Sequence, residues 1–270
     1  MKYRLFSFAA VFCFLASNAF GQLTAEKPKK WTRSHMTSTL GGHVDRYKNM
    51  DLEFLQGRIN DDQYGGSDLS NYRKNDNIYN TSGGMWNVNL QFTKATDPNE
   101  PRHYEQLEFG MSLHFGREVM IDYDMEDPYG FCSTNSLNYC ASTITFCDMQ
   151  NELNVSGIYK SGVHINKRFN MYMGMGASLG TTFESAMWIF QTQYSTSNQY
   201  FGDMTGDESY DMSEIVTGRL FVPFGVEIIF LKRCKFISEF RYGVGFATSA
   251  GHGTFANTNS SMSFGFGWTI

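Results

Sequence analysis

The sequence lacks a long internal apolar run. Beyond its amino-terminal segment, no window reaches the roughly 18 uninterrupted apolar residues of a membrane-spanning helix, so any residence in a membrane cannot be helical. It also lacks a basic patch, and its net charge of −5 is mild, so we expect no nucleic-acid partner. Paired His and Cys at metal-ligand spacing are missing too, and we therefore expect no metal site and no cofactor.

The amino-terminal segment has the features of an export signal. A basic start, an apolar run from Leu5 to Ala16 and small residues at Ala19 and Gly21 are typical of a secretory signal peptide. We expect residues 1–21 to be cleaved and the mature chain to be exported. Residues 22–39 carry several basic side chains without periodicity, and we interpret them as a periplasmic lead-in.

What the sequence does contain is a repeated alternation of apolar with polar or small residues. It is clearest from Gly218 to Phe246, where two alternating runs joined by about five residues predict an antiparallel hairpin. Residues 40–59 are less regular, and we predict a first strand there, although a helix fits them as well. The other predicted strands cover residues 86–92, 107–123, 153–165, 169–179, 218–230, 236–246 and 262–270.

The connections between these eight strands alternate in length. They are short after the second, fourth and sixth strands. The long or moderate connections are residues 60–84, 126–148, 185–213 and 248–258. Outer-membrane barrels have short periplasmic turns, long external loops and an even number of strands. The sequence therefore predicts an all-β, eight-stranded antiparallel up-and-down barrel over residues 40–270, closed because an open edge in lipid would leave backbone groups unpaired.

The two faces of the strands differ in polarity. A charge that faces lipid costs roughly 2–4 kcal/mol near the midplane, whereas charges inside a barrel can pair. We therefore predict an external belt in contact with outer-membrane lipids, formed by Leu220, Phe224, Ile228, Phe240, Phe264, Phe266 and Trp268. We predict an interior charge network, plugging the lumen, formed by Glu108, His114, Lys160, His164, Arg219, Glu227, Glu239 and Arg241.

The register of the hairpin between residues 218 and 246 follows from its charges. A three-residue loop sets Glu227 opposite Arg241, whereas a register shifted by two sets Glu227 opposite Glu239, which is unfavourable across a strand pair. We predict a Glu227–Arg241 ion pair. Glu239 is then expected to reach Lys160, His164 or another cation across the lumen.

Two strands have irregular features. Pro223 falls in mid-strand, where it cannot donate to the ladder, and we expect a local bulge there. The apolar face of residues 107–115 continues in the same parity through Val119, Ile121 and Tyr123, so this strand is expected to extend beyond the bilayer with those side chains still on the lipid side.

Several glycines are predicted to point inward. They either clear a narrow pore or make room for the large charged side chains opposite them, and we favour the second interpretation because eight strands leave an interior that side chains can just fill. These residues are Gly174, Gly176, Gly243, Gly245, Gly265 and Gly267.

Four cysteines remain after the signal is removed. Cys132, Cys140 and Cys147 share one predicted loop, while Cys234 lies in a turn on the opposite side of the membrane and cannot pair with them. At most one disulfide can form within the loop. We predict Cys132–Cys140, and unpaired buried thiols remain the alternative.

The carboxy-terminal stretch from Met262 to Ile270 is an alternating aromatic strand, and it resembles the insertion signal of outer-membrane barrels. It ends on isoleucine, where Phe or Trp is usual. The chain from about Leu40 is similar to the small eight-stranded outer-membrane proteins of the OmpA and OmpX type. The resemblance lies in architecture, and it implies fold and location.

Three classes of function fit this architecture. The first is a non-enzymatic, monomeric barrel that stabilises the envelope or binds an extracellular partner through its loops. The second is a narrow, porin-like channel for small solutes, and the third is a lipid A-modifying acyl-transfer or deacylation enzyme. Such an enzyme needs a serine beside an oriented histidine, but His114 and His164 point inward and His252 near Ser249 has no evident acid. We predict the first class, with no catalytic residues.

Overall fold

The computed structural model describes residues 31–47, 52–60, 69, 72–74, 80–94, 102–125, 140–195, 203–231, 233–249 and 253–270. The predicted signal peptide lies outside these residues. The long strands are β1 (Trp31–Tyr47), β3 (Asn80–Lys94), β4 (His103–Met125), β5 (Cys140–His164), β6 (Phe169–Ser195), β8 (Val216–Leu231), β9 (Cys234–Ser249) and β10 (Gly253–Thr269). The shorter elements are helix α2 (Leu52–Gly57) and strands β2 (Tyr72–Lys74) and β7 (Asp203–Asp211).

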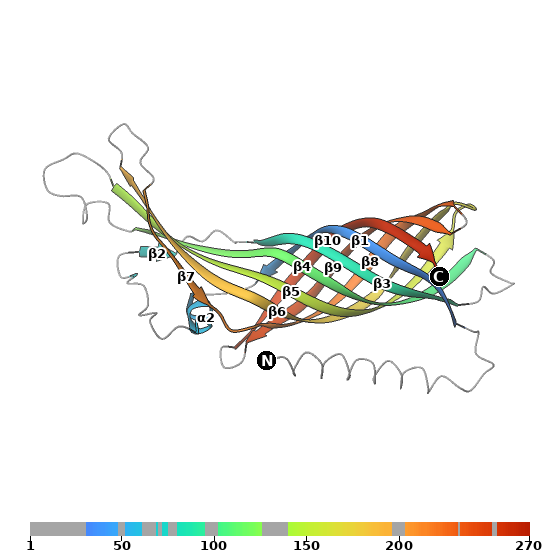
Figure 1. Cartoon of the computed structure of the whole chain (residues 1–270), viewed down its shortest axis with the longest axis horizontal. Coiled ribbons are helices and arrows are strands. Elements are labelled where there is room, and N and C mark those ends of the chain that lie inside the picture. The colour runs from blue at the N-terminus through green and yellow to red at the C-terminus, as the bar shows by residue number, and fades with distance from the viewer. Residues whose placement is uncertain are drawn as a thin grey trace, which may run out of the picture.

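The eight long strands form a closed antiparallel ring (Figure 1). Each pairs with the next long strand in the chain, and β10 returns to pair with β1, with Thr39 opposite Gly265. The predicted eight-stranded up-and-down barrel is therefore confirmed. Closure pairs the backbone groups along both edges of every ring strand, which a sheet in lipid requires. No helix in the described part of the chain is long and apolar enough to cross a membrane.

The barrel is apolar outside and polar inside. Side chains of the predicted external belt lie on the outer surface, where Leu220 is 65% exposed and Phe224 51% exposed. Glu108 and Lys160, from the predicted interior set, are almost completely buried. This inverted distribution is the one that a lipid environment selects, because lipid rather than water surrounds the ring. The chain is an outer-membrane β-barrel.

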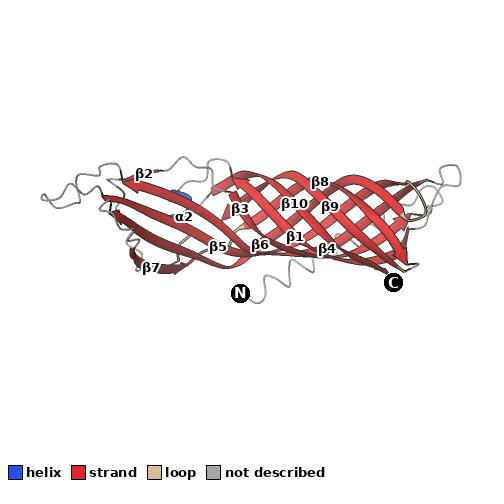
Figure 2. Cartoon of the chain, turned by 90° about the horizontal axis from the view of Figure 1, so that it is seen from above, coloured by secondary structure: helices blue, strands red, loops and turns tan. Residues whose placement is uncertain are grey.

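Strands β4, β5 and β6 continue past the ring at the long-loop end (Figure 2). There β2 adds to the edge formed by β4, and β7 adds to the edge formed by β6. We call this five-stranded antiparallel part the extension sheet. It consists of residues 117–125, 140–150 and 186–195 together with β2 and β7.

Helix α2 packs on the inner face of the extension sheet and forms an apolar cap over the barrel mouth. Phe54 and Leu55 of the helix are buried, and the Phe54 ring lies 4.4 Å from the Phe255 ring of β10. The cap contains the apolar cluster Tyr47, Leu52, Phe54, Leu55, Val119, Ile121, Ile144, Phe146, Met187, Ile189, Met212, Ile215 and Ala247. Because these residues come from β1, β4, β5, β6 and β9 as well as the helix, the cap joins opposite walls of the ring.

Several predicted boundaries differ from the structure. Strand β1 begins at Trp31, inside the predicted lead-in, and the ambiguous segment 40–59 contains both the end of a strand and a helix. The predicted long loops are partly strand, because β3 starts at Asn80, β5 starts at Cys140 and β6 continues to Ser195. Strands β2 and β7 also lie in predicted loops. The added parts of β5 and β6 alternate polar side chains with apolar ones facing the cap, such as Ile144, Phe146, Met187 and Ile189, so composition alone made them look like loops.

Two bulges mark the level at which the extension sheet leaves the ring. On β4 the register shifts at Gly116, whose φ is +62°, and on β6 it shifts at Glu184, whose φ is +52°. Asn151 of β5 lies between them. Its Oδ1 accepts a hydrogen bond from the Gly116 N–H (3.2 Å), and its Nδ2 donates to Glu184 Oε2 (3.1 Å).

The bulge at Gly116 corrects the prediction for the end of this strand. An extra residue reverses which side chains face inward. Val119 and Ile121, predicted on the lipid side, therefore point inward into the apolar cap. Tyr123 is half-buried and packs against that cluster as well.

The predicted bulge at Pro223 is wrong. Strand β8 keeps one register with β9 across Pro223, which lies opposite Arg241, and one register with β6 on both sides of it. The β6–β8 ladder is interrupted at Gly174 and Met175, which face Pro223 and Val222 in this register. A missing N–H removes hydrogen bonds without requiring an extra residue, so the strand tolerates the proline by losing ladder contacts.

Candidate functional site

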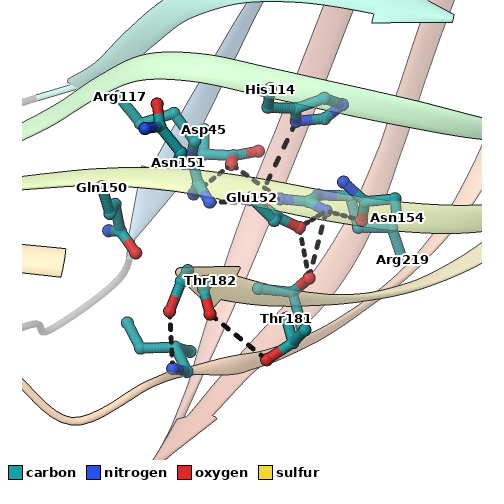
Figure 3. A network of polar contacts seen from close by, with 12 residues as sticks. Asp45, His114, Arg117, Gln150, Asn151, Glu152, Asn154, Thr181, Thr182 and Arg219 are labelled. Carbon is teal, nitrogen blue, oxygen red and sulfur yellow. Dashed lines mark hydrogen bonds and ion pairs between the residues drawn. The ribbon is translucent and has the colours of Figure 1, made fainter. Parts of the chain in front are cut away.

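The buried charges of the barrel interior form the candidate site, and they fall into two groups. The first lies near the long-loop end and is centred on Glu152 of β5 (Figure 3). Its carboxylate lies between two guanidinium groups: it accepts hydrogen bonds from Arg117, and from Arg219 through both terminal nitrogens (2.5 and 2.8 Å). Asp45 of β1 reaches both arginines from across the lumen, at 2.7 Å from Arg117 Nη2 and 3.0 Å from Arg219 Nη2.

We call Asp45, Arg117, Glu152 and Arg219 the loop-end network. Its two cations and two carboxylates balance, and all four side chains are almost completely buried. Neutral groups complete the hydrogen bonding, since Arg117 also donates to the Tyr47 hydroxyl (2.6 Å). A buried ion pair is stable only when its geometry and remaining hydrogen bonds offset desolvation. Here each carboxylate contacts two guanidinium groups.

The second group lies nearer the short-turn end. Lys160 Nζ is 2.8 Å from Glu108 Oε1 and 2.5 Å from Glu239 Oε2. Glu239 also accepts hydrogen bonds from Arg241 Nε (2.6 Å) and from the Tyr172 hydroxyl (2.7 Å). These contacts link strands β4, β5, β6 and β9 across the lumen, so the interior at this level is crossed by side chains.

The same group extends toward the turns through Lys235 at the start of β9. Its Nζ contacts Glu227 Oε1 at 2.5 Å and donates to Gln91 Oε1 at 2.6 Å. Gln91 in turn donates to Glu108 through its Nε2, which joins both halves. We call these charges the turn-end network: Glu108, Lys160, Glu227, Lys235, Glu239 and Arg241. Cations and carboxylates are again equal in number.

The predicted Glu227–Arg241 ion pair is wrong. In the β8–β9 ladder Glu227 lies opposite Ile237, and Arg241 lies opposite Pro223. The hairpin instead has an irregularity between Ile229 and Leu231, which the assumed three-residue loop did not include. Glu227 therefore pairs with Lys235. Glu239 pairs with Lys160, one of the cations expected for it.

Histidine and other polar side chains lie between the two networks, and Nδ1 of His114 is 3.9 Å from Glu152 Oε2 of the loop-end network. The rings of His43 and His114 lie with their centroids 4.3 Å apart. They line a cavity of about 30 Å³ together with Ser112 and Asn259. Among the described residues, neither nitrogen of His43 has a hydrogen-bond partner, and His114 Nδ1 has none either. A cavity of this size and polarity suits a single water molecule.

His164, predicted inside the lumen, lies at its rim. The side chain is half-buried and stacks on Tyr104, with ring centroids 4.8 Å apart. Its Nδ1 lies 2.8 Å from Asn170 Oδ1, and Asn170 donates to Glu227. The histidine thus contacts the turn-end network only through an amide.

The sequence interpretation missed several members of the networks. Asp45 and Lys235 lie in segments assigned to an uncertain strand and to a turn, while Glu152 immediately precedes the predicted fourth strand. Arg117 was missed because it follows the bulge. Gly116, the residue type that most readily takes a positive φ, was the local signal that could have revealed it.

The inward glycines make room for neighbouring groups. A Cβ at Gly176 would come within 2.5 Å of the Phe221 ring, and one at Gly243 would come within 2.1 Å of the Leu220 carbonyl oxygen. The space at these positions is filled by a side chain and by the adjacent strand. The predicted charged neighbour is found at Gly267, where a Cβ would come within 3.0 Å of the Lys235 side chain.

The cap has an ion pair of its own. Arg58, directly after α2, is fully buried, with its Nη1 2.6 Å from Asp148 Oδ2. It also donates to the Ser213 carbonyl oxygen from Nε (3.2 Å) and Nη2 (2.9 Å). These bonds tie the end of the helix to β5 and to the chain that follows β7.

The cysteines do not all behave as predicted. Cys147 lies in β5 rather than in a loop, where it is buried and free, and Cys234 is free at the start of β9. Burial, with the nearby carboxylates of Glu118 and Asp148, raises the pKa of the Cys147 thiol to about 12. The predicted Cys132–Cys140 bridge lies outside the side chains that the structure describes.

Within the described ranges, no cluster of three or more His, Cys, Asp or Glu side chains is placed to hold a metal ion. The Oγ of Ser112 lies 3.4 Å from Nε2 of His114, but both side chains are buried in the lumen.

Comparisons with known proteins identify no family. No protein-family model matches the chain, and no curated protein matches it. Among solved structures, it is similar to the attachment invasion locus protein Ail of Yersinia pestis, at 12% identity over 88% of this chain and 100% of that chain, with a TM-score of 0.29. It is also similar to the outer membrane protein OprG of Pseudomonas aeruginosa, at 12% identity over 90% of this chain and 99% of that chain, with a TM-score of 0.34. At such scores the fold assignment rests on the closed ring of strands.

Proposed function

We propose that this protein is a non-enzymatic, monomeric outer-membrane barrel with a closed lumen, and that it acts at the cell surface through its extension sheet. The observation that carries the proposal is the filling of the interior. Two cavities between described interior side chains measure about 30 Å³ and about 10 Å³, no more than a water molecule each. A solute pathway needs a continuous opening, and ion pairs that cross the lumen at two levels oppose one.

The apolar cap supports the same function. It covers the long-loop mouth with α2, which is held by the buried Arg58–Asp148 pair. A packed hydrophobic core across the entrance would obstruct the passage of solutes through a channel. An external domain built on β4, β5 and β6 gains a rigid support for surface contacts.

Electrical recording tests the closed lumen. The purified protein, inserted into planar bilayers, is expected to give no resolved single-channel currents, with a general porin as the positive control. Stable current steps from the wild-type protein would support the narrow channel instead. Mass spectrometry of lipid A from overexpressing cells is expected to show no shift, and a lost or gained acyl chain would establish the enzyme.

A further inference from the structure

Two neighbouring turns carry the same basic pair at the short-turn end of the barrel, where the chain ends (Figure 1). The turn between β5 and β6 contains Lys167 and Arg168, and the turn between β8 and β9 contains Lys232 and Arg233. Strands β6 and β8 are paired in the ring, and the Ile229 N–H donates a hydrogen bond to the Arg168 carbonyl oxygen (2.7 Å). The two turns therefore adjoin on the barrel rim.

The first of these turns is ordered by one of its own side chains. Asn166 Oδ1 accepts hydrogen bonds from the backbone N–H groups of Arg168 (2.8 Å) and Phe169 (2.9 Å). Lys167 and Arg168 are exposed, and so is Arg233 in the second turn. We call Lys167, Arg168 and Arg233 the basic turn cluster. Because its backbone is already ordered, the first turn can hold a ligand without the cost of ordering a loop.

Within the described residues, no carboxylate neutralises the basic turn cluster. None of its three cations forms an ion pair there, and neither turn contains an aspartate or a glutamate. Of the acidic residues on β5, β6, β8 and β9, Glu227 is the nearest to either turn in the sequence. It is buried and lies 2.5 Å from Lys235 Nζ, so its charge is already balanced. The cluster therefore presents uncompensated positive charge.

The positive charge of the rim is concentrated where β6 meets β8. On the β4 side, Glu105 pairs with Lys94 at 2.6 Å. In the segment that leads into β4, Asp97 and Glu100 precede Arg102, so charges of both signs are present there. The charged residues in the turns before β6 and β9 are all basic. An anionic ligand is therefore expected at the boundary between β6 and β8.

An aromatic girdle marks the level of the cluster in the membrane. The Phe266 ring of β10 contacts the rings of Phe230 and Phe236, with centroids 6.2 and 5.7 Å away. Such girdles lie at the interfaces of outer-membrane barrels, whose short turns face the periplasm. Arg233 lies in the turn between Phe230 and Phe236, so the cluster is at the headgroup level of the periplasmic leaflet.

Exposed apolar side chains accompany the cations. Ile165 is 54% exposed and lies in the first turn, and Leu231 is 60% exposed and lies directly before the second. A soluble anion would leave these side chains in water, whereas a phospholipid covers them with its acyl chains. Apolar side chains beside basic ones are the arrangement of a surface that lies at a membrane interface.

We propose that the basic turn cluster binds the headgroup phosphates of anionic phospholipids in the periplasmic leaflet. Each guanidinium group can donate two parallel hydrogen bonds to phosphate oxygens, and the lysine ammonium adds a point charge. A zwitterionic headgroup carries a cation of its own, which the cluster repels, so the cluster selects headgroups with net negative charge. The inference goes beyond the surface role proposed above and does not depend on it.

Native mass spectrometry of the full-length protein tests the proposal. The probe is an equimolar mixture of phosphatidylglycerol and phosphatidylcholine with identical acyl chains, added to the protein in detergent micelles. We expect the wild type to retain phosphatidylglycerol at least about tenfold more than phosphatidylcholine, since each basic residue near an anionic surface contributes about a fivefold factor. Arg168→Gln/Arg233→Gln should lower this ratio at least about fivefold, whereas Arg168→Lys/Arg233→Lys should largely keep it.

The matched control is Arg73→Gln/Lys74→Gln, which removes two exposed cations from the extension sheet at the opposite end and should leave the ratio unchanged. Heat-modifiable gel mobility verifies that each variant is folded. A wild-type ratio near one, or an unchanged ratio in the folded Gln variant of the two turns, would overturn the proposal. An equal loss in the control would show that net charge, and not these turns, selects the lipid. Displacement of bound phosphatidylglycerol by inositol hexakisphosphate at the same concentration would identify a soluble polyanion as the ligand instead.

Discussion

The barrel and the extension sheet share three strands but have opposite interiors. Below the bulges, β4 directs Glu108 and His114 inward, and above them it directs Val119 and Ile121 inward. From this change in polarity we infer that the outer surroundings change at the same level, from lipid to water. One continuous strand therefore passes through two environments. In each region the interior is opposite in polarity to its surroundings.

The strands change from a polar to an apolar inward face in two ways. Strands β4 and β6 each add a residue at a bulge, which reverses the inward parity. Strand β5 keeps its parity, since Glu152, Asp148 and Phe146 all face inward, and changes residue type along the face instead. Asn151 links the two bulges, so the three strands change at one level. The comparison teaches that parity in a strand is a local property, which a single residue can reverse.

The largest effect is expected from breaking the polar interior. Arg117→Met removes one of the two guanidinium groups that neutralise Glu152 and Asp45. We expect a loss of about 3–5 kcal/mol of unfolding free energy, because buried carboxylates are left undercompensated. Urea titration of the barrel in lipid vesicles measures it. The double variant Arg117→Met/Asp45→Asn should be less destabilised than the sum of the single changes, and strict additivity would contradict the network.

The corresponding change in the apolar cap should act locally. Leu55→Ala removes a fully buried side chain of α2 and is expected to cost the cap about 2–5 kcal/mol. Hydrogen exchange should rise in α2 and the inner face of the extension sheet, with the ring strands still protected. Glu53→Ala, at an exposed position of the same helix, is the control. Loss of protection throughout the ring would show that the two regions fold as one unit.

A matched pair of substitutions compares the two outer surfaces. Met175→Arg places a charge on the outward face of the ring, where Met175 is 68% exposed and lies opposite Tyr159 of β5, and is expected to cost about 2–4 kcal/mol near the midplane. Met120→Arg places the same charge on the outward face of the extension sheet and is expected to cost less than about 0.5 kcal/mol. Urea titration in vesicles compares them. Equal costs would contradict a membrane boundary at the level of the bulges at Gly116 and Glu184.

The smallest effect tests the bulge. Gly116→Ala puts a Cβ on a residue with φ of +62° and should cost about 1–2 kcal/mol. No atom lies within 4 Å of that Cβ, so the cost reports backbone strain alone. Gly157→Ala, where the added Cβ makes ordinary contact with Phe109, is expected to be neutral or slightly stabilising. A neutral result for both variants, by urea titration, would show that the bulge is not under conformational constraint.

Much of the barrel could be predicted from local pattern. Alternation such as Phe264 and Phe266 against Gly265 and Gly267 needs no tertiary information, because successive side chains on a strand face opposite ways. The strand count and the lipid-facing surface follow from it. The extension sheet could not be found in this way, since its segments contain many Asp, Asn, Ser and Thr residues, which are typical of loops.

The pairing of charges within the site could not be predicted from local pattern, because it depended on strand register and on closure of the ring. Glu227 was known to point inward, but its partner required the register of a hairpin whose turn contains an irregularity. Arg117 and Asp45 come from segments far apart in the chain, and only the closed ring brings them together.

The sequence by itself determined the fold class, the orientation of most ring side chains and the inverted polarity, because a period of two and the contrast between lipid and water act on each strand separately. The tertiary structure decided the bulges, the hairpin register, the cross-lumen ion pairs and the cap. Each depends on how distant strands align when the ring closes, and a shift of one residue changes every contact without altering the pattern along the strand.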